Sequence, residues 1–207
     1  MKKILFTLFL FNSFVVFAQI NSESGKITFR NGDTAFRTIS YFFDRPEEII
    51  VEDSLGKTII VSPIQIQEIM LDKGRKFVSK NFGRERDSTT ILLQSIIESP
   101  AISLFTREES AAPVFFVSKN NILYRLENNE IIVKNESGSF INHDSKFIGT
   151  LKALMADRQD ITDNLDKIRL NEVEMVDVVS KYDRGNVTYF WQTKTKIKKE
   201  PFLVLLG

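Results

Sequence analysis

The chain has no cysteine among its 207 residues and only one histidine, His143. Small exported domains with weak cores often depend on disulfides, and this chain cannot form one. Burial of apolar side chains must therefore hold the fold together. The lack of cysteine also excludes thiolate metal sites and cysteine nucleophiles, and a single histidine excludes zinc sites that need two imidazoles.

An excess of charge of either sign is also missing, because 28 Lys and Arg residues stand against 27 Asp and Glu. Binding to nucleic acid needs a basic excess, so no nucleic-acid partner is expected. Glycine-rich phosphate loops and the G-x-S-x-G nucleophile elbow are absent as well. The apolar fraction of 43% and the charged fraction of 27% are those of an ordinary globular protein.

The first eighteen residues have the pattern of an export signal. Lys2 and Lys3 precede an apolar stretch over 4–17, and Val16 and Ala18 supply the small residues that signal peptidase accepts. The stretch is shorter than the roughly 20 residues of a membrane-spanning helix. We expect cleavage after Ala18 and, with no cysteine at the cut, no lipid attachment. The mature chain would keep 189 residues, with 26 of the 28 basic residues against 27 acidic ones.

From Gly25 to about Val133, the sequence is rich in Ile, Val, Phe and Thr and is interrupted by turn residues, a pattern typical of strands. Asn31-Gly32 predicts a tight hairpin turn with positive φ at both residues, and Asn120-Asn121 predicts another turn. Residues 82–90 are polar and are expected to form a loop. Segment 91–97 fits either a buried strand or a short helix, and we favour the strand. The other expected strands cover 26–30, 34–42, 48–52, 57–61, 75–80, 102–106, 114–118 and 122–126.

The apolar period becomes helical after Asp144, which is a suitable N-cap. Phe147, Leu151, Leu154 and Met155 form one apolar stripe and predict a first helix.

A later helix is indicated by Asn171 followed by Glu174, which resembles a capping box. Gly185 is expected to end this helix, and 161–170 to form a short helix before it. The apolar stripe of the later helix is Met175, Val176, Val179 and Tyr182.

The last segment is extended rather than helical. Residues 187–191 are aromatic, 193–200 form a polar lysine-rich connector, and Pro201 precedes the apolar run 202–207. If this apolar run were exposed to solvent, it would promote aggregation. Either it docks into the sheet of this domain or the coding unit once continued.

Two groups of residues superficially suggest catalytic or metal sites. His143, Asp144 and Ser145 have the residue types of a triad, but adjacent residues cannot supply its geometry, so a loop histidine and a helix cap are expected. An aspartate also recurs every third residue without the glycine bend and closing glutamate of an EF-hand calcium loop, and caps and a solvated helix face explain this better. These aspartates are Asp157, Asp160, Asp163 and Asp166. We expect no catalytic residue, no cofactor and no metal.

Two features near the C-terminal end leave alternatives open. The only basic cluster would either contact anionic headgroups at a membrane surface, at about 1 kcal/mol per residue, or form a solvated linker. Tyr189, Phe190 and Trp191 could stack on sugars, although Trp191 could equally belong to a core or an interface. The basic cluster consists of Lys194, Lys196, Lys198 and Lys199.

The order of short apolar motifs resembles the N-terminal periplasmic domain of a group of outer-membrane β-barrel proteins from the Bacteroidota. In that group the domain precedes a C-terminal barrel, and the resemblance implies that 202–207 would begin the first barrel strand, with the barrel itself missing here. No catalytic residues come with the resemblance. The motifs that carry it are Gly25-Lys26-Ile27, Arg45-Pro46-Glu47-Glu48-Ile49-Ile50-Val51, Leu92-Leu93-Gln94-Ser95-Ile96-Ile97, Ala101-Ile102-Ser103-Leu104-Phe105, Phe115-Phe116-Val117, Leu123-Tyr124-Arg125-Leu126, Leu151-Lys152-Ala153-Leu154-Met155 and Val179-Ser180-Lys181-Tyr182-Asp183.

The expected fold is α+β, with antiparallel sheet from the first two thirds covered by two or three helices from the last third. A signal over 1–18 precedes a periplasmic domain over 19–185, with strands at about 26–133 and helices at about 145–183. Residues 186–207 are expected to be an extended linker and the start of a barrel strand. The predicted role is non-enzymatic interaction at the outer membrane with a barrel, another envelope protein or the cell wall, close to the membrane without spanning it. The alternative is a periplasmic small-molecule or glycan-binding module, or a hydrolase that uses carboxylates alone.

Overall fold

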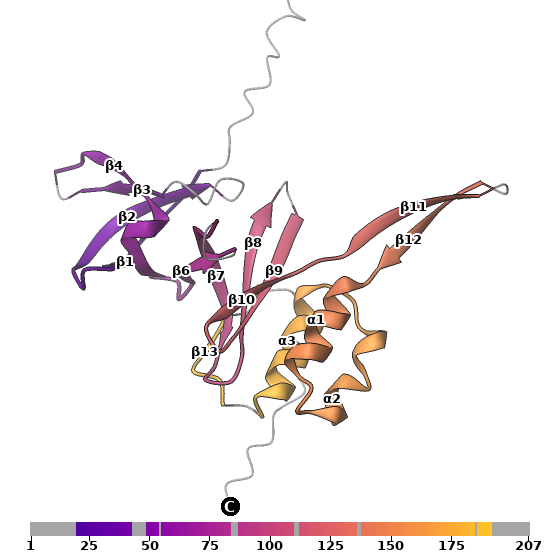
Figure 1. The fold of residues 1–207 in the computed structure, drawn as a ribbon. Helices are drawn as coiled ribbons and strands as arrows, with labels where there is room; N and C mark the ends of the chain where they lie inside the picture. Colours follow the sequence, from indigo (N-terminus) through magenta and orange to yellow (C-terminus); the bar gives the residue numbers. More distant parts are fainter. Residues whose placement is uncertain are drawn as a thin grey trace, which may run out of the picture.

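The computed structural model describes residues 20–42, 49–53, 55–83, 87–109, 112–135, 138–184 and 186–191. It consists mostly of antiparallel sheet with helices toward the C-terminus, so the expected α+β class holds in broad terms (Figure 1). The strands are β1 (Ile20–Phe29), β2 (Thr34–Phe42), β3 (Ile49–Glu52), β4 (Thr58–Val61), β5 (Ile66–Leu71), β6 (Lys76–Phe82), β7 (Thr89–Glu98), β8 (Ser103–Glu109), β9 (Ala112–Lys119), β10 (Ile122–Leu126), β11 (Asn129–Asn135), β12 (Gly138–Asp144) and β13 (Tyr189–Phe190). The helical segments are η1 (Pro63–Gln65), α1 (Lys146–Leu154), α2 (Gln159–Thr162), η2 (Leu165–Lys167) and α3 (Glu172–Tyr182).

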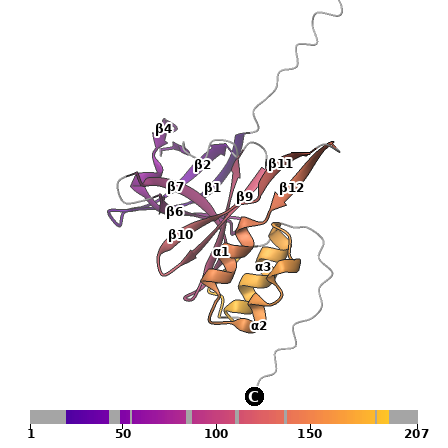
Figure 2. The ribbon, with the colours of Figure 1, turned by 45° about the vertical axis from the view of Figure 1, so that its right-hand side comes forward.

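One long sheet runs in the order β10-β9-β8-β7-β6-β5-β1-β2-β3-β4, and each neighbouring pair is antiparallel. The order departs from a simple meander once, where the chain passes through η1 and β5 returns to pair with the free side of β1. Figure 1 shows β1–β4 at one end of the molecule and the helices at the other. The β11–β12 hairpin forms a separate two-stranded sheet that projects from the body in both views (Figures 1 and 2).

Apolar side chains form three buried clusters along this sheet. One lies among β1–β5 and contains Ile27 and Ile69, and a second joins β7–β10 to the helices through Leu104, Phe147 and others. The third lies on the other face of β6–β9 around Phe105. Because β7 contributes to all three clusters, it is buried on both faces. This confirms the strand rather than the helix for 91–97.

The predicted helical stripes face the sheet. Three residues of each stripe are buried. They are Phe147, Leu151 and Met155 in the first stripe and Met175, Val179 and Tyr182 in the second. The intervening segment is less regular than expected, since 161–170 contains only the end of α2 and the single turn η2. Within the described residues, no helix is long and apolar enough to cross a bilayer.

Of the two predicted N-caps, the one at Asn171 is correct and the one at Asp144 is wrong. Asn171 caps α3 as predicted, because its side chain accepts a hydrogen bond from the Glu174 N–H. Asp144 does not cap α1; it is the last residue of β12, and Ser145 occupies the N-cap position. The prediction failed because β12 continues up to the helix and leaves no loop in which Asp144 could cap it. Gly185 lies outside the described residues, and Arg184, with φ 53°, takes the left-handed conformation beyond α3.

The tight turn predicted at Asn31-Gly32 is found instead at Asn120-Asn121. Asn120 and Asn121 have φ of 53° and 61°, and Lys119 pairs with Ile122, which is the tight two-residue turn with positive φ at both positions. At Asn31-Gly32 only Gly32 has a positive φ, and the Phe29 N–H bonds to the Asp33 carbonyl across a longer loop. The tight-turn prediction for Asn31-Gly32 was therefore wrong.

Strand limits also differ from the expected ones. β1 begins at Ile20 rather than near residue 26, since its early polar residues pair along β2, from Ile20 with Phe42 onward. The sequence also gave no indication of β12, which extends the strands to Asp144. The loop expected at 82–90 is shorter because β6 and β7 reach into it.

Candidate functional site

A cleft lies on the face of β6–β9 that the helices leave uncovered. It has a volume of about 480 Å³, and its lining includes Lys76, Lys80, Glu98, Ser103, Phe105 and Ser118. Side chains alternate between the two faces of a strand, so Lys76 and Lys80 point to the same side as the apolar cluster around Phe105. This cleft combines charged and aromatic groups and is the natural candidate site.

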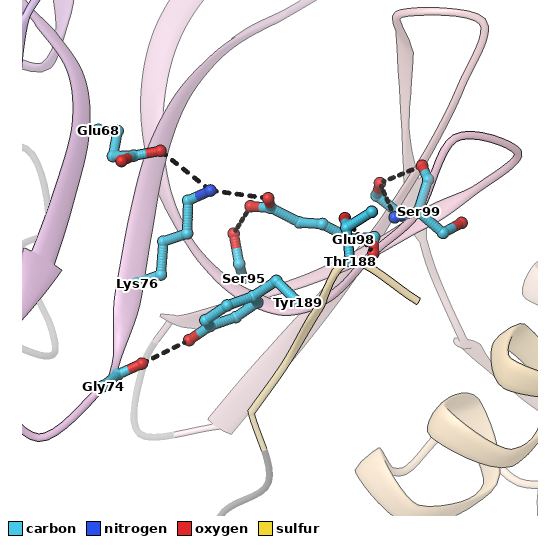
Figure 3. A network of polar contacts seen from close by, with 9 residues as sticks. Glu68, Gly74, Lys76, Ser95, Glu98, Ser99, Thr188 and Tyr189 are labelled. Carbon is cyan, nitrogen blue, oxygen red and sulfur yellow. Dashed lines mark hydrogen bonds and ion pairs between the residues drawn. The ribbon is translucent and has the colours of Figure 1, made fainter. Parts of the chain in front are cut away.

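Lys76 is the centre of the polar contacts in this cleft (Figure 3). Its Nζ lies 2.7 Å from Glu98 Oε2 and 2.9 Å from Glu68 Oε2, and Ser95 Oγ donates to Glu98 Oε1 at 2.5 Å. Three neighbouring strands, β5, β6 and β7, thus meet at one ammonium group. Both carboxylates face the lysine, whose single positive charge they share.

A β-bulge explains why Ser95 and Glu98 can meet. Residues three apart on a regular strand point to opposite faces. The register of β7 against β8 shifts between Ser95 and Ile97, and Ile96 and Ile97 both enter the cluster under the helices. This extra residue returns Glu98 to the side of Ser95.

The same cluster holds β13 against the sheet. Thr188 donates to the Glu98 carbonyl through both its N–H, at 2.8 Å, and its Oγ1, at 2.9 Å. Tyr189 Oη donates to the Gly74 carbonyl at 2.9 Å, and Lys76 Nζ lies 5.6 Å from the centre of the Tyr189 ring. The Trp191 N–H donates to the Ile96 carbonyl at 2.8 Å. The segment at 188–191 is therefore held by backbone carbonyls of β7 and of the β5–β6 turn.

Burial affects the two titratable groups at this junction differently. Burial raises the pKa of the Tyr189 phenol above its ordinary value of 10.0. Burial alone would lower the pKa of Lys76, but the hydrogen bonds to Glu98 and Glu68 outweigh it and hold that pKa above 10.5. Both groups are thus held in their protonated forms by the fold.

We predict that the free energy of unfolding falls as the pH rises above about 10. Both folded-state pKa values lie above the unfolded ones, so the stabilisation is complete below the unfolded values and is lost as pH rises through the folded ones. Urea unfolding between pH 8 and 11.5 measures this, and Tyr189→Phe, which removes one of these titrations, should give a shallower decline. An equal decline in both proteins would show that Tyr189 does not contribute.

A second polar cluster ties the sheet to the helices. Tyr182 Oη donates to both Asp157 carboxylate oxygens at 2.8 Å, and Lys119 Nζ donates to Tyr182 Oη at 2.6 Å and also to the Leu154 carbonyl. The hydrogen bond from Tyr182, with the nearby Lys119 charge, lowers the pKa of Asp157. These contacts fix α3 and the end of α1 to β9, which is a structural role.

The residues singled out in the sequence do not converge on a site. His143 lies in β12, where it pairs in register with Glu130, and not in the expected loop. Each of the four aspartates has its own partner: Asp157 binds Tyr182 and Lys119, Asp160 binds Arg158, Asp163 binds Gln159 and Asp166 binds Lys152. Asp163 is the C-cap residue of α2, none of the four is an N-cap, and all four are exposed, so the interpretation as caps and a solvated face is correct in part. In the described ranges, no group of three or more His, Asp or Glu is placed to hold a metal ion.

The three aromatic residues at 189–191 do not all lie on one side of the strand. Tyr189 and Trp191 lie on one side of the strand, over Gly74 at the β5–β6 turn, while Phe190 points the other way and is 49% exposed. Lys194, Lys196, Lys198, Lys199 and 202–207 lie outside the described residues.

The sequence did not reveal Lys76 or Glu98 as site residues. Lys76 and Glu98 are 22 residues apart, and Tyr189 meets Gly74 across 115 positions. The only local signal was the alternation of Lys76, Val78 and Lys80 along β6, which shows a shared face but not its partners.

Comparison with the profiles of protein families, with curated proteins and with solved structures finds none that matches this chain.

Proposed function

We propose that the chain is an exported, non-enzymatic interaction domain that works next to the outer membrane. The observation that carries the proposal is the use of the polar groups in the cleft. Lys76, Glu68 and Glu98 pair with one another across β5, β6 and β7, and Tyr189 Oη joins β13 to the Gly74 carbonyl at the β5–β6 turn. A site whose charges pair with one another and whose tyrosine holds a chain segment suits a scaffold better than a catalyst.

The geometry disfavours the hydrolase alternative. Carboxylate-only glycoside hydrolysis needs two carboxyl groups with the scissile bond between them. Here Lys76 Nζ lies between Glu68 and Glu98, within 2.9 Å of each, and occupies the space that a substrate would need. The separated directions of Tyr189 and Phe190 likewise disfavour stacking on a glycan.

The proposed location rests on the pattern at 1–18 and on the resemblance to barrel-linked domains. Expression of the tagged chain in a Bacteroidota host tests it. We expect a mature chain that begins at Gln19, measured by mass spectrometry, and recovery with the envelope fraction. In the control variant Ala18→Asp, in which the signal-peptidase site is blocked, the uncleaved precursor should accumulate.

Chemical cross-linking of intact cells tests the interaction role. A specific envelope protein cross-linked to the chain is the expected result. Recovery from the periplasm as a monomer that cross-links to nothing would contradict the proposal, and so would full-length chain retained in the cytoplasm.

A further inference from the structure

The two ends of the long sheet are protected very differently. β10, at one end, carries Arg125, which pairs with Glu109 at 2.9 Å and lies 3.5 Å from Glu127. The following backbone is covered by α1, since the Phe147 N–H donates to the Glu127 carbonyl. Charge and a covering helix are the usual means by which a sheet edge is kept from pairing with other chains.

β4, at the other end, has none of these protections. The strand reads Thr-Ile-Ile-Val, with no charge, proline or register shift, and among the residues that the structure describes β3 is the only strand that pairs with it. Ile59 is 41% exposed and Ile60 is 66% exposed. Figure 1 shows β4 at the outer margin of the sheet, far from the helices. An uncharged strand with a free edge is a template for another strand.

A groove with a volume of about 450 Å³ borders this strand. It lies between Ile59, Ile60 and Val61 of β4 and the end of β1 with η1, and its other lining residues are Phe29, Arg30, Asn31 and Gln65. Successive residues of a strand point to opposite faces, so a groove lined by both Ile59 and Ile60 reaches the edge of β4. Its occupant must satisfy the outward backbone N–H and C=O groups of β4, which a strand does and a helix does not.

The size of the edge favours a short segment over a second copy of the chain. The apolar side chains exposed at this end of the sheet, on β4 and at Leu55 and Ile64, offer roughly 400 Å², about half of what each partner buries in a standard interface. A strand that adds to an edge gains its affinity from main-chain hydrogen bonds instead and needs only a few side-chain contacts.

The charges around the groove indicate the chemistry of the segment. Arg30 and Lys57 are exposed beside it, and neither forms an ion pair with a residue that the structure describes. A carboxylate on the segment would complement them.

We propose that β4 is the docking edge of the domain, on which an extended partner segment with alternating apolar residues and an acidic residue adds as a further strand. This inference rests on the proposed interaction role and specifies where the partner binds.

The test is selection of a phage-displayed library of random twelve-residue peptides on the chain recovered after export. We expect enriched peptides with apolar residues at alternate positions and at least one Asp or Glu. In fluorescence anisotropy, Ile60→Lys should weaken binding of the enriched peptide by at least about tenfold, because a buried lysine now faces the added strand. The matched control Ile122→Lys alters an isoleucine that is 55% exposed on β10 and should leave binding unchanged.

Amide hydrogen exchange gives a second, independent measurement. Bound peptide should slow exchange in β4 and leave β10 unaffected. Selected peptides that bind Ile60→Lys and the parent chain equally would overturn the inference, as would a library that yields no binder. A dimer in sedimentation that Ile60→Lys dissolves would assign the edge to a second copy instead.

The outcomes separate this inference from the proposed function. If the chain is exported and cross-links to an envelope protein equally well with Ile60→Lys, the interaction role stands and the docking edge is wrong. If the chain stays in the cytoplasm, the proposed function fails whatever the peptides do at β4.

Discussion

Replacement of Phe147 by alanine is expected to lower the free energy of unfolding by about 3–5 kcal/mol. Phe147 is 1% exposed and joins α1 to the cluster that includes Leu104 and Phe115. Truncation removes the apolar contact area of a ring and leaves a cavity that the surrounding sheet and helices can fill only partly. Urea unfolding followed by circular dichroism measures the loss.

Phe36→Ala is the matched control for this prediction. The chemical change is the same, but the Phe36 side chain on β2 is 70% exposed, so its loss should stay within about 0.5 kcal/mol. Similar losses in the two variants would mean that the helices do not pack on the sheet as described. The comparison therefore tests the helix–sheet interface rather than the general cost of removing an aromatic ring.

The sequence predicted this interface well because helical periodicity is a local signal. Phe147 and Leu151 are one turn apart, and a stripe of such residues identifies the buried face without knowledge of its partner. The Asn171 cap was equally predictable, since its bond to Glu174 spans three residues. Most strands were recovered for the same reason, with limits that moved where pairing extended them, as at Ile20.

Strand order and the candidate site depend on contacts that local patterns do not contain. The pairing of β5 with β1 joins residues about forty positions apart, from Ile27 with Ile69 outward. The meeting of Lys76 with Glu98 further requires the β7 bulge, which shifts the parity of every later residue in the strand. A one-residue bulge of this kind cannot be recognised in the alternation of apolar and polar residues along the sequence. The site could therefore not be assembled from the sequence.

The second large effect is expected at that site. Lys76→Met should lower the free energy of unfolding by about 2–3 kcal/mol, because it leaves two partly buried carboxylates without their cation. Methionine keeps most of the aliphatic stem, so the loss is electrostatic rather than a loss of packing. The Lys76 side chain is 14% exposed, and that of Glu98 is 21% exposed.

The control for Lys76 is an ion pair of nearly the same length on the surface. Lys181 lies 2.6 Å from Asp177 on α3, against 2.7 Å for Lys76 and Glu98, but the side chains are 66% and 57% exposed. Lys181→Met should therefore change stability by no more than about 0.5 kcal/mol. A difference between the two variants measures the combined effect of burial and of the second carboxylate, Glu68, that Lys76 serves.

Two further measurements test the origin of the loss in Lys76→Met. The double variant Lys76→Met with Glu98→Gln should recover part of the loss, because the uncompensated charge at Glu98 is removed.

Trp191 is the only tryptophan, and its ring lies over Gly74, so its fluorescence reports whether the segment after Thr188 stays against the sheet. We expect the Trp191 emission of Lys76→Met to shift to the red at urea concentrations below the main unfolding transition. If fluorescence and circular dichroism instead change together in both proteins, Lys76 stabilises the whole sheet and β13 is held by its backbone hydrogen bonds alone.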